Sequence, residues 1–481
     1  MKIVLINSSI RETLSYGIED GFPEGLDELI GTYPPLGICY LASVLRENGF
    51  NDITLIDAEI ERDLESVISS TLKENPDIIG ISAMTFSFLY ALKLAKKLKE
   101  KTDVPIVVGG PHVDFYPMEV MSHKCFDIGV IGEGEYTFLD IVKLLRKNKK
   151  EDFIRKLGKI DGIVFRRGNK IIRTRERPFI KNLDEIPFPA RDLLDIKKYH
   201  HTYLSNPFVS MITSRGCPYR CSFCSRTKWN LVWRAHSPEY VVSEIKHCID
   251  KFGITSFQFF DDTFTVSKER VLKISNLIRK EKLKVKIVCL SRVDTVDREV
   301  LRAMKQAGVE TISFGFESGD EDVLKAMNKG TTIKQAKKAV ALCREVGIDS
   351  IGYFIVGYPS ETKKSILNTI KFIKEARPSW FKANLFVPYP GSTIYEKLIR
   401  EGKIVDFWRK MTIEGKPYTP PKVNENLSIE ELRKWISIIN SMVYLGEKSN
   451  LLHIHKIKTI DFKANLKWIK NTIINRLKYS W

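Results

Sequence analysis

Residues 214–224 read Ser-Arg-Gly-Cys-Pro-Tyr-Arg-Cys-Ser-Phe-Cys. The stretch places three cysteines within eight residues: Cys217, Cys221 and Cys224. Gly216 and Pro218 favour a tight turn, so three thiolates on this loop can face one metal centre. An iron–sulfur cube held by three cysteines leaves one iron open, and an open iron can bind a small molecule and pass it an electron.

A zinc site is the alternative for the same loop, with His236 as the fourth ligand. Zinc motifs more often contain pairs of cysteines separated by two residues, which favours the iron–sulfur interpretation. The other five cysteines are scattered through apolar sequence. They indicate a reducing compartment, the cytoplasm, and not a disulfide framework.

Composition sets the broad class of the protein. The chain has 481 residues, of which 43% are hydrophobic and 28% charged, as expected of a soluble protein with two or three domains. No run approaches the roughly 18 apolar residues of a spanning helix. The net charge of +18 is compatible with nucleic acid, an anionic membrane or an acidic substrate as a partner.

Residues 1–150 alternate short apolar runs with amphipathic stretches. The runs are 2–7, 53–58, 78–84, 105–110 and 128–131. Alternation of this kind predicts an α/β domain with a doubly wound parallel sheet, which binds ligands at the carboxyl ends of its strands. The first loop contains no G-x-G-x-x-G motif, so a dinucleotide site is excluded.

Residues 151–204 are predicted to connect two domains. The segment 161–175 reads as a hairpin around Gly168-Asn169, and Pro187 and Pro189 then interrupt regular structure. We therefore expect a domain boundary before residue 205.

Residues 205–400 contain six strand-like runs, each followed by a helical pattern. The runs are 208–213, 256–260, 285–290, 311–316, 350–356 and 381–387. Six such units predict a parallel partial barrel, (β/α)6, with its chemistry at the carboxyl ends of the strands. The cysteine loop follows the first strand. Asp261 and Asp262 follow the second, and one of them could instead cap the helix that begins near Ser267.

The cysteine spacing, with Phe223 before the last cysteine, resembles that of radical S-adenosylmethionine (SAM) enzymes. Residues 314–318 and 352–357 match that family's motifs in the fourth and fifth strands. The resemblance implies a [4Fe–4S] cluster whose open iron binds SAM and cleaves it to a 5′-deoxyadenosyl radical. It also implies a set of SAM-binding residues: Phe223, Asp261, Arg292, Gly315, Glu317, Ser318 and Gly357. Arg292 and Glu317 carry the charges that SAM needs, although an internal salt bridge is the alternative.

The first domain resembles the cobalamin-binding fold through its small loop residues. The matching positions are Ser82, Met84, Thr85, Gly109 and Gly110. The motif that would supply a histidine to cobalt is absent, so the resemblance implies cobalamin held without a protein histidine beneath it. An empty, vestigial sheet domain is the alternative. The turn Gly132-Glu133-Gly134-Glu135 is read as a loop into the next helix, and similar enzymes carry G-E-G-E there.

Residues 401–481 are predicted to be helical and basic. From Lys448 onward there are eight Lys or Arg and one Asp. A helix from about Phe462 would gather apolar residues on one face and lysines on the other. Such a helix could lie on an anionic membrane or dock on the barrel, and both interpretations stay open.

Together these features resemble the cobalamin-binding radical SAM family, which includes anaerobic magnesium-protoporphyrin monomethyl ester cyclase and hopanoid methylase. The resemblance implies methylation of an unactivated carbon in a small molecule, with electrons from a reducing partner such as ferredoxin or flavodoxin. The basic segment from Lys448, with its aromatic residues, favours a lipid as that molecule. The alternatives are a radical cyclase or carbon–carbon bond-forming enzyme acting on a lipid or tetrapyrrole, and a non-enzymatic cobalamin or redox sensor. Enzymes that methylthiolate transfer RNA resemble this chain but carry three more cluster cysteines in their N-terminal domain. The first domain here has only Cys39 and Cys125, so this function is set aside and no nucleic acid partner is expected.

Overall fold

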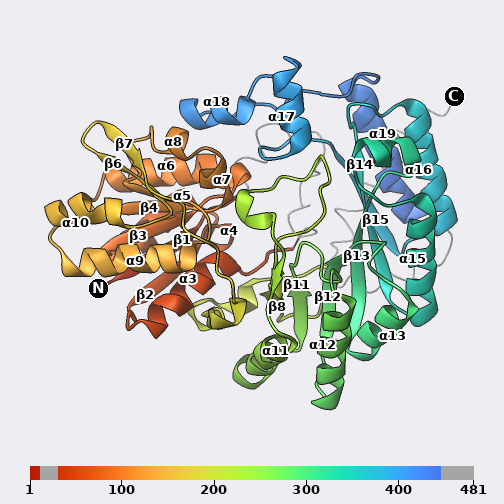
Figure 1. The fold of residues 1–481 in the computed structure, drawn as a ribbon, viewed down its shortest axis with the longest axis horizontal. Coiled ribbons are helices and arrows are strands. Elements are labelled where there is room, and N and C mark those ends of the chain that lie inside the picture. Colours follow the sequence, from red (N-terminus) through yellow and green to blue (C-terminus); the bar gives the residue numbers. More distant parts are fainter. Residues whose placement is uncertain (11–30, 446–481) are drawn as a thin grey trace.

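The computed structural model describes residues 1–10 and 31–445 (Figure 1). It contains two α/β domains side by side, and the last helices of the described chain reach across both of them. The basic segment predicted from about Phe462 lies outside the described residues.

The first domain is built on a sheet whose order is β2-β1-β3-β4-β5-β6-β7. Its parallel strands are β1 (Ile3–Asn7), β2 (Ile53–Asp57), β3 (Ile78–Ser82), β4 (Ile106–Gly109) and β5 (Ile128–Val130). Helices α3 (Leu36–Glu47) and α9 (Gly134–Lys147) pack together on one face, and α5 (Leu64–Lys73) and α6 (Phe88–Lys99) pack together on the other. The predicted doubly wound sheet is confirmed.

The predicted hairpin also forms, as β6 (Ile163–Arg167) and β7 (Lys170–Arg173). The sequence pattern places it in the connecting segment, whereas the structure pairs β6 antiparallel with β5. The hairpin therefore extends the first sheet. It covers the edge of β5, where backbone N–H and C=O groups would otherwise lack partners.

The second domain is a parallel sheet of order β15-β14-β13-β12-β11-β8, which curves into a partial barrel (Figure 1). Its strands are β8 (Val209–Met211), β11 (Ser256–Phe259), β12 (Lys286–Ser291), β13 (Val309–Glu317), β14 (Asp349–Val356) and β15 (Trp380–Leu385). Its main outer helices are α11 (Pro238–Phe252), α12 (Lys268–Lys280), α13 (Arg298–Gln306), α15 (Ile333–Val346) and α16 (Lys363–Ala376). All six predicted units are present in the predicted order.

Each outer helix begins at an N-cap residue whose hydroxyl or carboxylate oxygen accepts a hydrogen bond from a backbone N–H of the first turn. The capping residues are Ser237, Ser267, Asp297, Thr332 and Thr362. The expectation that Asp261 or Asp262 caps the helix near Ser267 is therefore wrong. Ser267 itself accepts from the N–H of Arg270, and no aspartate is needed there.

The C-terminal helices tie the two domains together. Helix α19 (Ile429–Leu445) packs against β15, where Asn440 exchanges two hydrogen bonds with the backbone of Ala383 at the barrel edge. Helix α18 (Phe407–Glu414), which follows α17 (Thr393–Arg400), returns to the first domain and packs on α8 (Pro117–Val120). No helix among the described residues is long and apolar enough to cross a membrane.

Candidate active site

The cysteine loop begins at the end of β8 and is anchored on several sides. The Ser222 hydroxyl lies 2.8 Å from the Tyr358 hydroxyl, and the Ser225 hydroxyl donates to the carbonyl of Pro390 at 2.6 Å. The Asn328 amide donates to the carbonyl of Arg220 at 2.7 Å. These contacts come from the chain that follows β13, β14 and β15, so the loop lies over the carboxyl ends of the barrel strands.

The three cysteines differ in exposure: Cys221 is buried, Cys217 is half-buried and Cys224 is exposed. Nη1 of Arg292 lies 3.6 Å from Sγ of Cys221, so a permanent positive charge stands beside this thiol. Within residues 1–10 and 31–445, no three His, Cys, Asp or Glu side chains are already grouped as a metal site. The fit to a cluster therefore rests on the three sulfur donors of one loop and on the adjacent cation.

Arg292 follows β12 and is held in a fixed orientation. Its guanidinium donates to both carboxylate oxygens of Asp294 at 2.9 Å and to the carbonyl of Lys329 at 2.8 Å. The guanidinium carbon lies 3.7 Å from the centre of the Tyr219 ring. Bidentate pairing and stacking together restrict a side chain that is otherwise flexible.

Glu317 ends β13 at a bulge, with φ of 64°. Its carboxylate accepts from Nζ of Lys329 at 2.7 Å, and both side chains are less than a tenth exposed. A Cβ at Gly315 would lie 2.2 Å from Oε1 of Glu317, so a larger residue there would displace this carboxylate. Glu317 and Arg292 thus form internal salt bridges, with Lys329 and Asp294 as the partners, and contact of either side chain with SAM stays a prediction.

Lys329 is the residue that the sequence did not reveal. Its Nζ also lies 5.7 Å from the centre of the Phe223 ring, in the cysteine loop. It therefore connects Glu317 with Phe223, while its carbonyl holds Arg292. Lys329 lies in the connection between α14 (Glu321–Ala326) and α15 and does not follow a strand directly. Only its contact with Glu317 in the folded chain marks it as a residue of the site.

Three other predicted residues make contacts elsewhere. Asp261 is fully buried and accepts from the N–H and hydroxyl of Thr213 and from the hydroxyl of Ser214, at 2.5 to 2.6 Å, which supports the base of the cysteine loop. Burial raises the pKa of Asp261 despite these donors. The hydroxyl of Ser318 lies 3.3 Å from that of Thr369 on α16. The N–H of Gly357 donates to Glu361 at 2.5 Å, and burial raises the pKa of that carboxyl to about 7.

The predicted cobalamin residues lie together at the carboxyl ends of β3 and β4. A Cβ at Gly109 would meet Cβ of Val130 at an ordinary contact distance of 3.6 Å, whereas Gly110 has φ of 102° and the carbonyl oxygen of Ala83 lies only 2.6 Å from where its Cβ would be. Met84 is 51% exposed at the same edge. Among the described residues the buried hydroxyl of Ser8, after β1, has no hydrogen-bond partner, and its N–H donates to the carbonyl of Ser82. Small residues and an unsatisfied hydroxyl fit a bulky polar ligand at this edge.

Two histidines near this edge, His112 and His123, form hydrogen bonds with Thr412 in the C-terminal region. Nε2 of His112 lies 2.9 Å from the hydroxyl of Thr412 on α18, and Nδ1 lies 3.4 Å from the hydroxyl of Thr85. Nε2 of His123 lies 2.6 Å from the carbonyl of Thr412. Burial lowers the pKa of His112 to about 3, so its ring is neutral. Both histidines contact Thr412 on α18, and the absence of a histidine ligand to cobalt stays a prediction.

Comparison with known proteins agrees with both halves of the site. A model of the radical SAM superfamily matches residues 211–373, and a model of the B12 binding domain matches residues 26–142. An uncharacterized methyltransferase of Pyrococcus horikoshii is 38% identical over 393 residues, which cover 80% of this chain and 83% of that protein. The chain belongs to the cobalamin-binding radical SAM family.

Two further relatives show how widely this architecture is used. Anaerobic magnesium-protoporphyrin IX monomethyl ester cyclase of Cereibacter sphaeroides is 28% identical over 81% of this chain and 64% of its own length. The structure of TsrM, a radical SAM methyltransferase from Kitasatospora setae with cobalamin and a [4Fe–4S] cluster bound, superposes with a TM-score of 0.66 at 16% identity. That superposition covers 84% of this chain and 76% of TsrM, and it shows the shared fold.

Membership assigns this radical SAM enzyme its cofactors: a [4Fe–4S] cluster, SAM and cobalamin. The zinc alternative is wrong. His236 is buried, its Nδ1 lies 3.2 Å from the carboxylate of Asp184, and its ring stacks on Tyr240. Its contacts place it under the loop as a structural side chain.

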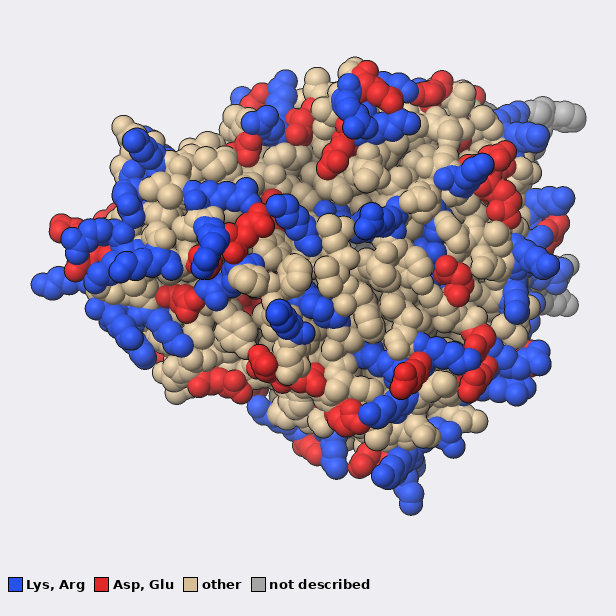
Figure 2. Space-filling model, in the orientation of Figure 1, with Lys and Arg blue, Asp and Glu red and all other residues tan. Residues whose placement is uncertain are grey.

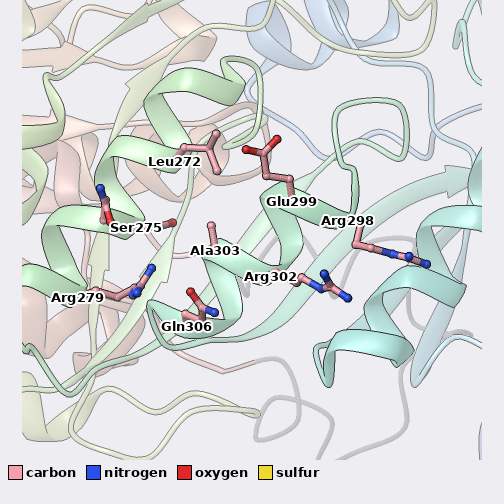
Figure 3. Close-up of a pocket in the computed structure, with 9 residues that line it drawn as sticks. Leu272, Ser275, Arg279, Arg298, Glu299, Arg302, Ala303 and Gln306 are labelled. Atoms are coloured by element: carbon pink, nitrogen blue, oxygen red, sulfur yellow. The ribbon is translucent and has the colours of Figure 1, made fainter.

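A separate hollow of about 580 Å³ lies on the outside of the barrel of this radical SAM enzyme, between α12 and α13 (Figure 3). Arg279, Arg298 and Arg302 line it, but Arg298 and Arg302 both pair with Glu345. None of the cofactor residues contributes to this hollow. Figure 2 shows Lys and Arg interspersed with Asp and Glu on the visible face, with uncharged side chains over much of its middle.

Proposed function

We propose that this protein is a methyltransferase that adds a methyl group to an unactivated carbon of a small molecule or lipid. When bound, the cluster supplies the electron that cleaves SAM to a 5′-deoxyadenosyl radical, and cobalamin supplies the methyl group. The likeness to a relative named as a methyltransferase, at 38% identity over most of both chains, supports this choice.

One observation carries the proposal: the carboxyl edge of the first sheet meets the cysteine loop of the barrel. Trp229, in the segment after the last cysteine, packs on Gly132 at the end of β5, where a Cβ would lie 2.5 Å from its ring. Ligands of parallel sheets bind at this edge in both domains. A radical generated at one edge would therefore be close to a methyl donor held at the other.

On the barrel side, we propose that charged side chains bind SAM. SAM carries an ammonium, a carboxylate and ribose hydroxyls, and the carboxylate of Glu317 and the cations of Arg292 and Lys329 complement these groups. Phe223 provides an apolar surface beside them. Cys217, Cys221 and Cys224 would hold the cluster.

On the side of the first domain, the proposed work is to accommodate cobalamin by shape. Ser82, Met84, Thr85, Gly109 and Gly110 would contact it, and the buried hydroxyl of Ser8 is a further donor at this edge. No histidine ligand is expected from His112 or His123, because Thr412 engages both.

Labelled SAM tests the proposal directly. The full chain is reconstituted anaerobically with iron, sulfide and cobalamin, reduced, and given SAM with a deuterated methyl group. Mass spectrometry then follows the label. Transfer of the label to cobalamin supports a methyltransferase. Formation of 5′-deoxyadenosine with no labelled cobalamin contradicts it and favours a radical cyclase, while failure to cleave SAM at all favours a sensor.

The lipid preference and the redox partner are tested separately. The lipid preference rests on the basic segment beyond residue 446, which lies outside the described residues. Sedimentation of the full chain with vesicles of phosphatidylglycerol, and not with neutral phosphatidylcholine, would support a peripheral membrane location. Absence of sedimentation would remove the support for lipid. Reduced flavodoxin or ferredoxin should replace chemical reductant in the SAM cleavage assay.

A further inference from the structure

The turn Gly132–Glu135 of the first domain makes contacts that its position in the sequence does not suggest. It follows β5 and starts α9, yet its carboxylates reach into the barrel domain. Glu133 accepts from Nη1 of Arg215 at 2.8 Å and from Nη1 of Arg234 at 2.9 Å. Glu135 accepts from Nη2 of Arg215 at 2.6 Å. The four side chains are between 8% and 15% exposed, so this is a buried ion-pair cluster between domains.

The two arginines stand at the base of the cysteine loop. Arg215 lies in β9 (Ser214–Arg215), two residues before Cys217, and Arg234 lies in β10 (Arg234–Ala235). The two short strands pair antiparallel, with Arg215 opposite Arg234. All three cysteines therefore belong to a loop whose two ends are both held by Glu133, and Glu135 adds a second contact to Arg215.

The backbone of the turn holds the loop at a third point. Gly132 has φ of 85° and no side chain, which lets the Trp229 ring pack directly on it. Its N–H donates to the carboxylate of Asp114 at 2.6 Å, and this bond fixes the turn. Trp229 lies between Cys224 and Arg234, so the contact falls within the segment that the ion pairs enclose.

The electrostatics favour a rigid arrangement. Burial acts to raise the pKa of Glu133, but the hydrogen bond from Arg234 and the charge of Arg215 outweigh it and lower the pKa. Glu133 is thus ionised beside two guanidiniums, and the side chains of the cluster are at most 15% exposed. Charges in such a region interact more strongly than on the surface, and their directions are fixed by the bidentate geometry of arginine.

We propose that the 132–135 turn is a positioning element for the iron–sulfur cluster. It acts through Arg215 and Arg234, fixes the cysteine loop relative to the edge of the cobalamin domain, and so sets the surroundings of the cluster from the other domain. The proposal requires only the radical SAM chemistry of the family. It is independent of methyl transfer and of the substrate.

The test compares Glu133→Gln and Glu135→Gln with Glu119→Gln in the full chain. A glutamine keeps an acceptor oxygen and the side-chain volume but removes the charge. Glu119 is a matched control, because it pairs with Arg409 at 2.7 Å on α18 and joins the first domain to a different part of the chain. The readouts are iron and sulfide per chain, the midpoint potential of the cluster, and its electron paramagnetic resonance spectrum with and without SAM.

We expect each of the two variants at the turn to change the spectrum and shift the potential, and to lower the rate of 5′-deoxyadenosine formation severalfold. The control should match the parent protein. Cobalamin uptake is measured in parallel and should be unchanged, because the loops after β3 and β4 are untouched. Parent spectra and potentials in both Glu133→Gln and Glu135→Gln would overturn the proposal.

Arg215→Lys covers the case in which the glutamate variants fail to fold. It keeps a positive charge near Glu133 and loses the two-pronged contact that reaches both carboxylates. An altered cluster spectrum in a folded Arg215→Lys protein supports a positioning role. If Arg215→Lys folds with the parent spectrum and potential, the ion pairs serve stability alone and the proposal fails.

Discussion

The carboxyl ends of the two sheets differ in the side chains that they carry. At the barrel end, Arg292, Glu317 and Lys329 are charged, and each is fixed by an ion pair or a backbone carbonyl. At the ends of β3 and β4 in the first sheet, Gly109 and Gly110 contribute no side chains, and the N–H of Ala83 donates to the carbonyl of Gly109.

The difference corresponds to what each edge is expected to bind. A small charged molecule such as SAM is recognised by the placement of opposite charges, so its site needs oriented side chains. A large ring system such as cobalamin needs space and close approach to the backbone, so its site needs glycine and other small residues. Substitutions at the two edges should therefore fail in different ways, and four experiments test this difference.

The largest effect is expected from Cys221→Ala. Removing one of three protein ligands should reduce iron from about four atoms per chain to less than one, and abolish formation of 5′-deoxyadenosine. Cys343→Ala is the control, since Cys343 is also buried but lies in the core of the barrel wall. The measurement is iron content and SAM cleavage after anaerobic reconstitution. A Cys221→Ala protein that keeps its cluster would remove the cysteine loop from the site.

The next effect is expected from Glu317→Gln at the charged edge. Loss of a charge-assisted hydrogen bond of about 1.5–3 kcal/mol should weaken SAM binding roughly 10- to 100-fold. Stability should also fall, because Lys329 is left buried without its counter-charge. Equilibrium dialysis with SAM and thermal unfolding measure the two effects.

A double variant separates these effects. In Glu317→Gln with Lys329→Met, stability should partly return because no buried charge is left unpaired, whereas SAM binding should stay weak. Glu375→Gln breaks the exposed pair with Lys337 and should change neither property. Recovery of SAM binding in the double variant would show that Glu317 acts only on the fold.

Sequence reasoning succeeded where the signal is local. The cysteine spacing, the six strand–helix units and the hairpin around Gly168 all depend on residues close together in the chain, and the structure contains each of them. Small residues after β3 and β4 gave a weaker signal, because glycine and serine are common in any loop. The B12 binding domain match supports that interpretation.

Contacts between distant residues could not be predicted. Lys329 meets Glu317 only because the chain after β13 turns back toward the strand end, and Arg215 meets Glu133 across the boundary between domains. Neither pairing has a periodicity or spacing that a single sequence displays. The hairpin was assigned to the connecting segment for the same reason, since its pairing with β5 is a tertiary contact.

Gly110→Ala tests the uncharged edge. Two costs are expected, a left-handed backbone that alanine adopts with strain and a clash of its Cβ with the carbonyl of Ala83. Together they should lower stability by about 1–3 kcal/mol and reduce the amount of cobalamin retained per chain. Gly49→Ala is the matched control, because Gly49 also has positive φ, 78°, but in the described part of the chain no atom lies within 4 Å of the added methyl.

The control isolates the strain from the clash. Gly49→Ala should lose some stability and no cobalamin, as measured by thermal unfolding and by absorbance after gel filtration. If both variants lose cobalamin equally, shape at the edge of the first sheet is not what holds the ligand. SAM binding should be unaffected in either protein, since the barrel edge is unchanged.

The smallest functional effect is expected from His112→Gln. Because Thr412 and Thr85 take both ring nitrogens, the absorbance spectrum of bound cobalamin should be the same in the variant and the parent. A spectral change would show that a histidine side chain contributes to cobalt, and the contrast between the two edges would then be weaker than proposed.

Stability of the same variant should depend less on pH. The neutral ring is retained in the folded protein, where burial lowers the pKa of His112 to about 3, while the unfolded chain takes up a proton near pH 6.5. Between these values the unfolded state binds more protons, so acidification destabilises the parent, by about 2 kcal/mol between pH 7 and pH 5 from this residue. Glutamine has no such proton, so denaturant unfolding at pH 7 and pH 5 should differ less in His112→Gln. The dependence of the free energy of unfolding on pH should become weaker in the variant but should not vanish, because burial also lowers the pKa of His201 to about 4.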